Sequence, residues 1–141
     1  MSFDAEKVHE IQERRARNSA AAWASVRDIV RPSMLMWTKL LEGEDGSQWI
    51  HALKRLIVIV SASVEGDCKR WLHVSLSRAT SIPSWEDVRE VKDAFIGTDR
   101  KAIQVLPRAS EYVNINPYVL HLWHCVDGDG LPDFTGGSGS I

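Results

Sequence analysis

Residues 71–124 constrain the fold more than any other part of the chain, because they predict a strand, a helix and two further strands in close succession. In the first strand, residues 71–77, every second side chain is apolar, so Leu72, Val74 and Leu76 should share the face that packs on a core. The residues between them share the opposite face: Trp71, His73, Ser75 and Ser77. The chain is therefore expected to build a sheet with one apolar face and one face that carries polar groups beside a tryptophan.

The clearest helix is predicted over residues 84–96. Ser84 can cap its first turn, Asp87 can complete a capping box, and Gly97 supplies the C-terminal stop. Four side chains at helical spacing form an apolar face that should lie on the sheet: Trp85, Val88, Val91 and Phe95. The acidic side chains of this helix are expected to face solvent: Glu86, Asp87, Glu90 and Asp93.

The remaining elements follow from propensity. A long N-terminal helix is predicted over residues 4–30, because the segment contains strong helix formers without Gly or Pro, and Pro32 then stops it. Residues 56–60 are continuously apolar and β-branched, which is typical of a central strand covered on both faces. Two further strands are predicted over residues 101–106 and 118–126.

Together these elements predict an α+β fold with an antiparallel sheet of about four or five strands and the helix over residues 84–96 packed on one face. The N-terminal helix is expected on the other face or on a partner subunit, and the second case would make the protein a homodimer. We divide the chain into an N-terminal helix (residues 1–31), an α+β domain (residues 32–126) and a disordered, Gly-rich tail (residues 127–141).

Composition excludes some classes of function. The chain has 141 residues, enough for one domain with its own core, and no apolar run near the roughly 20 residues that a membrane-spanning helix needs. Its N-terminus has no signal-peptide core, so a cytoplasmic protein without membrane contact is expected, with Cys68 and Cys125 as reduced thiols. A net charge of −2 disfavours nucleic acid as a partner, and six tryptophans favour a surface that contacts a partner.

His73 and Ser75 resemble the H-x-[ST] element of the two-histidine phosphoesterases. In that chemistry one imidazole acts as a base and a second as an acid on a phosphodiester, while each hydroxyl helps to hold the phosphate. The last strand offers His121 as the second imidazole, but Trp123 stands where the second hydroxyl should be. A phosphoesterase-like enzyme that uses His73, Ser75 and His121 is therefore an alternative function with half of its motif missing.

The histidines do not predict a metal site. His121 and His124 are three residues apart on a strand and so point to opposite faces. His73 and His121 could share an ion with Cys68 or Cys125, but histidines that are hydrogen-bonded within the fold are the favoured interpretation. Because no nucleotide-binding glycine motif occurs either, neither a metal nor a cofactor is predicted.

A small nucleotide-like ligand is a further candidate partner. The loop over residues 107–117 joins the last two predicted strands, a setting in which folds often present binding residues. Arg78, Arg108 and Trp123 could neutralise a phosphate and stack on a base. The full set of candidate ligand-binding residues comes from the polar strand face and this loop: Trp71, His73, Ser75, Arg78, Arg108, Asn114, His121 and Trp123.

Residues 69–124 carry an ordered set of short motifs: W-L-H-V-S-L-S, P-S-W-E-D-V-R-E-V-K-D-A-F, A-I-Q-V-L-P, E-Y-V-N and L-H-L-W. In these motifs the chain resembles a family of small uncharacterised proteins of bacteriophages and prophages, a domain of unknown function. The resemblance implies no catalytic residues, but it implies a phage product in the cytoplasm of a host bacterium. The leading expectation is a non-catalytic binding module that blocks or sequesters a host component, such as a protein of antiviral defence.

Overall fold

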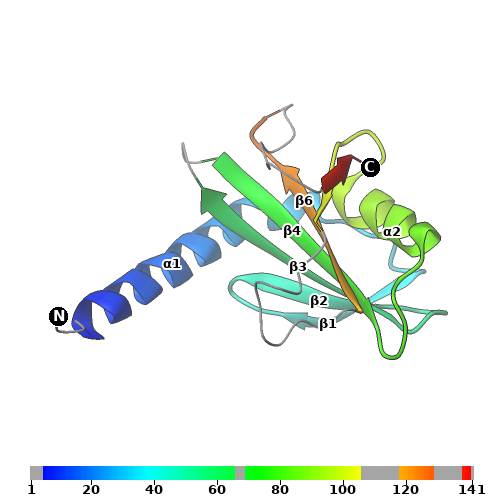
Figure 1. The fold of residues 1–141 in the computed structure, drawn as a ribbon, viewed down its shortest axis with the longest axis horizontal. Coiled ribbons are helices and arrows are strands. Elements are labelled where there is room, and N and C mark those ends of the chain that lie inside the picture. Colours follow the sequence, from blue (N-terminus) through cyan, green and yellow to red (C-terminus); the bar gives the residue numbers. More distant parts are fainter. Residues whose placement is uncertain (1–4, 66–68, 106–117, 129–137, 141) are drawn as a thin grey trace.

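The computed structural model describes residues 5–65, 69–105, 118–128 and 138–140. The described residues form these elements, in chain order: α1 (Ala5–Val26), the 3-10 turn η1 (Arg27–Ile29), β1 (Trp37–Glu42), β2 (Gly46–His51), β3 (Leu56–Glu65), β4 (Lys69–Arg78), α2 (Trp85–Val91), the π-helical turn η2 (Lys92–Ile96), β5 (Ile103–Val105), β6 (Val119–Cys125) and β7 (Ser138–Ser140). The strands make one antiparallel sheet in the order β1-β2-β3-β4-β6-β5-β7 (Figure 1).

The α+β class is confirmed, but the expected strand number of four or five is too low, because the described residues form seven strands. The β1–β2 hairpin accounts for most of the difference. In β1 only Trp37 is buried and every following side chain is exposed, so the strand lacks the alternation by which a half-buried strand is recognised. The short β7 pairs with β5 and comes from the segment that was expected to be a disordered tail, most of which lies outside the described residues.

Both helices lie on the same face of the sheet (Figure 1). Trp23 and Val26 of α1 belong to one buried core with Phe95 of η2, and Phe95 packs edge-on against Trp37 and Trp49 of the β1–β2 hairpin. The expectation that the N-terminal helix lies on the opposite face or on a partner subunit is therefore wrong. The sheet has one continuous apolar face, so both amphipathic helices bury their apolar sides against it.

The N-terminal helix also differs from its expected form. It ends at Val26 and tightens into η1, so it is shorter than the predicted segment 4–30. Its second half packs on the sheet, whereas its first half projects beyond it (Figure 1). No helix in the described part of the chain is both long and apolar enough to cross a membrane.

The helix predicted over residues 84–96 forms as α2 and η2. Its capping box is confirmed, because the Ser84 hydroxyl accepts a hydrogen bond from the Asp87 amide while the Asp87 carboxylate accepts one from the Ser84 amide. Gly97 ends it with a φ of 129°, a conformation that favours glycine. Trp85 was expected on the apolar face but is exposed, because it is the first helical residue and lies beyond the part of the helix that covers the sheet.

Gly46 is the position on which the β1–β2 turn depends. A Cβ atom added there would collide with the Val60 carbonyl oxygen on β3, whereas one added at Gly43 in the same turn would meet its nearest atom at 3.5 Å. We expect Gly46→Ala to lower the free energy of unfolding by about 2 kcal/mol and Gly43→Ala to change it by less than about 0.5 kcal/mol. Urea unfolding of the two variants measures the difference, and equal losses would contradict it.

Candidate functional site

The predicted histidines gather on the face of the sheet that the helices leave uncovered. This surface, which we call the His–Trp face, is formed by odd-numbered residues of β3, β4 and β6: Ile59, Ser61, Ser63, Trp71, His73, Ser75, His121 and Trp123. Leu72, Val74 and Leu76 point to the core on the other side, as the alternation predicts. Ile59 is 49% exposed, so β3 is not covered on both faces as expected.

Three aromatic rings form the centre of the His–Trp face. His73 Nε2 and His121 Nδ1 are 2.8 Å apart, a hydrogen bond in which one imidazole donates and the other accepts. The His73 ring stacks on Trp123, with ring centroids 4.2 Å apart and planes 20° apart. On its other nitrogen, Nδ1, His73 lies 3.5 Å from the Ser61 hydroxyl. The side chain of His73 is therefore engaged on three sides.

Strand register explains this arrangement. In the antiparallel β4–β6 pair, Ser75 lies opposite His121, and His73 lies opposite Trp123. Two H-x-[ST] elements in this register would place each histidine opposite the hydroxyl of the other strand. Only the Ser75–His121 half of that pattern is present here, because Trp123 fills the second hydroxyl position and covers His73.

Burial favours the neutral form of both histidines. Burial, followed by the proximity of His121, lowers the pKa of His73 from 6.5 to about 4. Burial also lowers the pKa of His121. A neutral pair satisfies the 2.8 Å contact with a single proton, whereas two imidazolium ions would repel each other there.

The other predicted ligand-binding residues do not all join this face. Arg78 lies on the helix-covered side, where its guanidinium donates to both carboxylate oxygens of Asp87 at 2.8 and 2.9 Å. Arg108 and Asn114 lie outside the described residues. Trp71 is half-buried on the His–Trp face, opposite Ser63 on β3 and Cys125 on β6.

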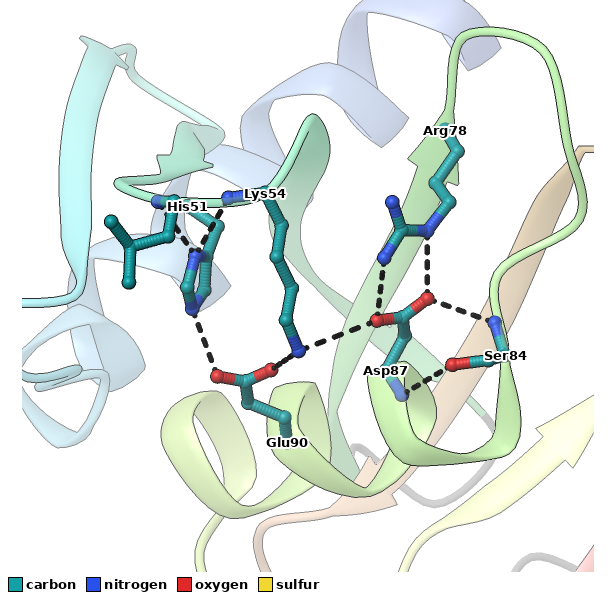
Figure 2. A network of polar contacts seen from close by, with 7 residues as sticks. His51, Lys54, Arg78, Ser84, Asp87 and Glu90 are labelled. Carbon is teal, nitrogen blue, oxygen red and sulfur yellow. Dashed lines mark hydrogen bonds and ion pairs between the residues drawn. The ribbon is translucent and has the colours of Figure 1, made fainter.

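Sequence reasoning missed a polar network on the opposite side of the sheet (Figure 2). The carboxylate of Glu90 on α2 accepts from Lys54 Nζ at 2.7 Å and lies 2.9 Å from Nε2 of the buried His51. Asp87, one turn earlier and only 1% exposed, pairs with Arg78 and lies 3.7 Å from Lys54 Nζ. The expectation that Asp87 and Glu90 face solvent is therefore wrong, because α2 turns its acidic side toward basic groups that flank the sheet.

The contacts of this network hold α2 against the segment that follows β2. The backbone amides of Leu53 and Lys54 donate to His51 Nδ1 at 3.0 and 3.2 Å, so its Nε2–H donates to Glu90 and both ring nitrogens are engaged. Burial acts to raise the pKa of Glu90, but hydrogen bonds from Lys54 and His51 outweigh it, and the pKa lies below its usual value. The contacts thus fasten α2 to the β2–β3 turn.

The remaining histidine and cysteine contacts show no assembled metal site. His124 Nδ1 lies 2.6 Å from the Lys101 carbonyl oxygen, on the face opposite His121 as its position in the strand predicts. Cys125 is a buried free thiol, and Cys68 lies outside the described residues. Within the described ranges, no three His, Cys, Asp or Glu side chains are grouped so that they could hold a metal ion.

Comparison with known proteins finds a similarity to a domain family. Residues 63–127 match the model of a domain of unknown function, DUF7694. The matched segment runs from the end of β3 to just beyond β6, so it includes Trp71, His73, Ser75, His121 and Trp123. The match supports the expected similarity to an uncharacterised domain family. No curated protein and no solved structure matches the chain significantly.

Proposed function

We propose that the protein is a non-catalytic binding module whose His–Trp face contacts a partner. The resemblance described above implies a phage product, so the proposed partner is a protein of the host bacterium that takes part in antiviral defence. Binding would block or sequester this protein. The observation that carries the proposal is Trp123, which lies opposite His73, stacks on it, and takes the place of the hydroxyl that acid–base chemistry on a phosphodiester would use.

The chemistry of the His–Trp face supports binding. It combines exposed apolar surface at Ile59 with half-buried Trp71 and Trp123, and large aromatic side chains dominate the energetics of protein interfaces. Neutral imidazoles also cost less to desolvate at an interface than charged ones.

A nucleotide-like ligand is the second candidate, because the stacked rings of His73 and Trp123 offer a platform of the kind on which bases stack. Arg78 does not supply the phosphate contact, since it pairs with Asp87 on the other side of the sheet. A thermal-shift screen with linear and cyclic mononucleotides tests this candidate. A rise in melting temperature that Trp123→Ala abolishes would favour a nucleotide over a protein partner.

The phosphoesterase alternative has a direct test as well. His121 and Ser75 lie opposite each other, and these are the groups that one half of the catalytic pattern requires. Hydrolysis of a phosphodiester by the wild-type protein, lost in both His73→Ala and His121→Ala, would establish an enzyme. Activity that persists in His73→Ala would exclude this mechanism.

We expect Trp123→Ala to weaken partner binding about 30-fold, the effect of losing a hot-spot residue, a class in which tryptophan is enriched. A photo-crosslinking amino acid at Ile59 in bacterial cells captures the partner, and calorimetry on the purified complex gives the dissociation constants. The matched control is Trp85→Ala, because Trp85 is an exposed tryptophan on α2, away from the His–Trp face.

Circular dichroism of Trp123→Ala separates lost binding from lost folding. The proposal fails if Trp123→Ala, while folded, binds the captured partner as tightly as the wild type, or if Trp85→Ala weakens binding by the same factor. It fails equally if crosslinkers at Ile59 yield no adduct while crosslinkers on α2 do.

A further inference from the structure

A cavity of about 420 Å³ lies between the end of α1 and the β1–β2 hairpin, on the helix-covered side of the sheet. It is separate from the His–Trp face and has two kinds of wall. Its buried floor contains Trp23, Ser47 and Trp49, whereas its exposed rim carries basic side chains from both sides. A buried aromatic floor with a few polar groups, below charged rim groups, is an arrangement that suits a small polar ligand.

Buried residues of the floor carry hydrogen-bond donors. Trp23 is 2% exposed, and its Nε1–H has no acceptor among the described residues, although a buried indole N–H normally has one. The Trp49 Nε1–H donates to the Ser47 hydroxyl oxygen at 2.8 Å, which leaves the hydroxyl proton of Ser47 available to donate. The Trp23 indole N–H therefore lacks an acceptor, and the Ser47 hydroxyl can still donate to one.

The rim supplies positive charge. Within the described ranges, Arg27 and Arg31 form no ion pair, and the only hydrogen bond of the Arg31 side chain is from Nε to the Asp28 carbonyl oxygen at 2.7 Å. Lys39 lies on the opposite rim, 5.1 Å above the centre of the Trp49 ring. Two acidic residues also line the cavity. Glu42 Oε2 lies 3.4 Å from Lys39 Nζ. The negative charge of Asp28 partly offsets the positive charge of Arg27 and Arg31.

We propose that this cavity binds a small oxyanion, the phosphate or carboxylate group of a metabolite. The oxyanion accepts from the Trp23 indole and the Ser47 hydroxyl on the floor, while the guanidinium groups of Arg27 and Arg31 approach from the rim. This site is independent of the function proposed for the His–Trp face, because none of its residues belongs to that face.

Nuclear magnetic resonance of the indole N–H groups tests the proposal. The chain has six tryptophans, so six indole signals are expected, and Trp23→Phe assigns the signal of Trp23. Titration with inorganic phosphate and pyrophosphate in one arm, and with succinate and citrate in the other, should shift the Trp23 signal saturably in at least one arm. The arm that saturates at lower concentration identifies the oxyanion.

Two surface variants make the test independent of folding. Arg27→Gln and Arg31→Gln should each weaken binding about tenfold, as the loss of a charge-assisted hydrogen bond does. Arg55→Gln, an equal change of charge at an exposed position outside the cavity lining, should leave it unchanged. The proposal is overturned if the Trp23 signal does not move in either arm, if sodium chloride of equal ionic strength moves it equally, or if all three variants bind like the wild type.

Discussion

Asp87→Ala will lower the free energy of unfolding by about 3 kcal/mol, the usual cost of removing one partner of a buried ion pair. The Asp87 carboxylate accepts two hydrogen bonds from Arg78 and one from the Ser84 amide, so a single substitution breaks both the ion pair and half of the capping box. Urea unfolding followed by circular dichroism at pH 7 measures the loss.

The matched control is Glu86→Ala. Glu86 is the neighbouring acidic residue in the first turn of α2 but is exposed, so its loss should cost less than about 0.5 kcal/mol. Asp87→Asn keeps the size of the side chain and should lie between the two variants. Similar stability of Asp87→Ala and Glu86→Ala would show that the Arg78–Asp87 pair contributes little.

The effect has a defined dependence on pH. The hydrogen bonds from Arg78, the largest cause, hold the pKa of Asp87 well below its ordinary value of 3.8. A carboxyl group whose pKa is lower in the folded state contributes its full stability above its unfolded pKa and loses it as the pH falls below that value. The difference between wild type and Asp87→Ala should therefore be constant at neutral pH and shrink below about pH 4.

The sequence predicts those parts of the fold that depend on local patterns. The alternation of β4 identifies its core face, and Ser84, Asp87 and Gly97 mark the ends of the second helix, because caps and stops are local. The same local rules place Asp87 on the solvent side of the helix. They fail there because its partner, Arg78, lies on a strand and meets it only in the folded chain.

The sheet face on which each helix packs depends on several strands together and not on one local pattern. To predict the face on which the N-terminal helix packs, one must know whether the sheet has one apolar face or two. The run at residues 56–60 indicates two such faces, but Ile59 is exposed and the facing residues on β4 and β6 are His and Ser. Hydrophobicity within one strand does not reveal the neighbours that it acquires across the sheet.

The candidate site shows the same limit. Strand parity correctly places His73 and Ser75 together and separates His121 from His124, because side-chain direction alternates within one strand. That His73 and His121 meet at 2.8 Å depends on the β4–β6 register, which the sequence does not specify. The indole N–H of Trp23, which has no acceptor among the described residues, likewise depends on how α1 meets the β1–β2 hairpin.

The His73–His121 pair should make the protein sensitive to mild acid. Burial, with the proximity of His121 as the second cause, lowers the pKa of His73 from 6.5 to about 4. Because the unfolded chain binds the proton more readily, the stability that neutral His73 contributes is complete above pH 6.5 and is lost as the pH falls toward 4. We expect the free energy of unfolding to fall by about 3 kcal/mol over this range from His73 alone.

Urea unfolding at several pH values between 7 and 4 measures this loss in the wild type and in His73→Gln, which keeps hydrogen-bonding capacity without titrating. The variant should lose much less stability over the same range, whereas the control His9→Gln, at an exposed position on α1, should follow the wild type. Identical pH dependence in wild type and His73→Gln would show that the imidazole pair is not the acid-sensitive element. A His73 ring that titrates near its ordinary pKa in a nuclear magnetic resonance titration would lead to the same conclusion. Partner binding through the His–Trp face should weaken over this range as well, because protonation places a charge between Trp123 and His121 that an interface would have to desolvate.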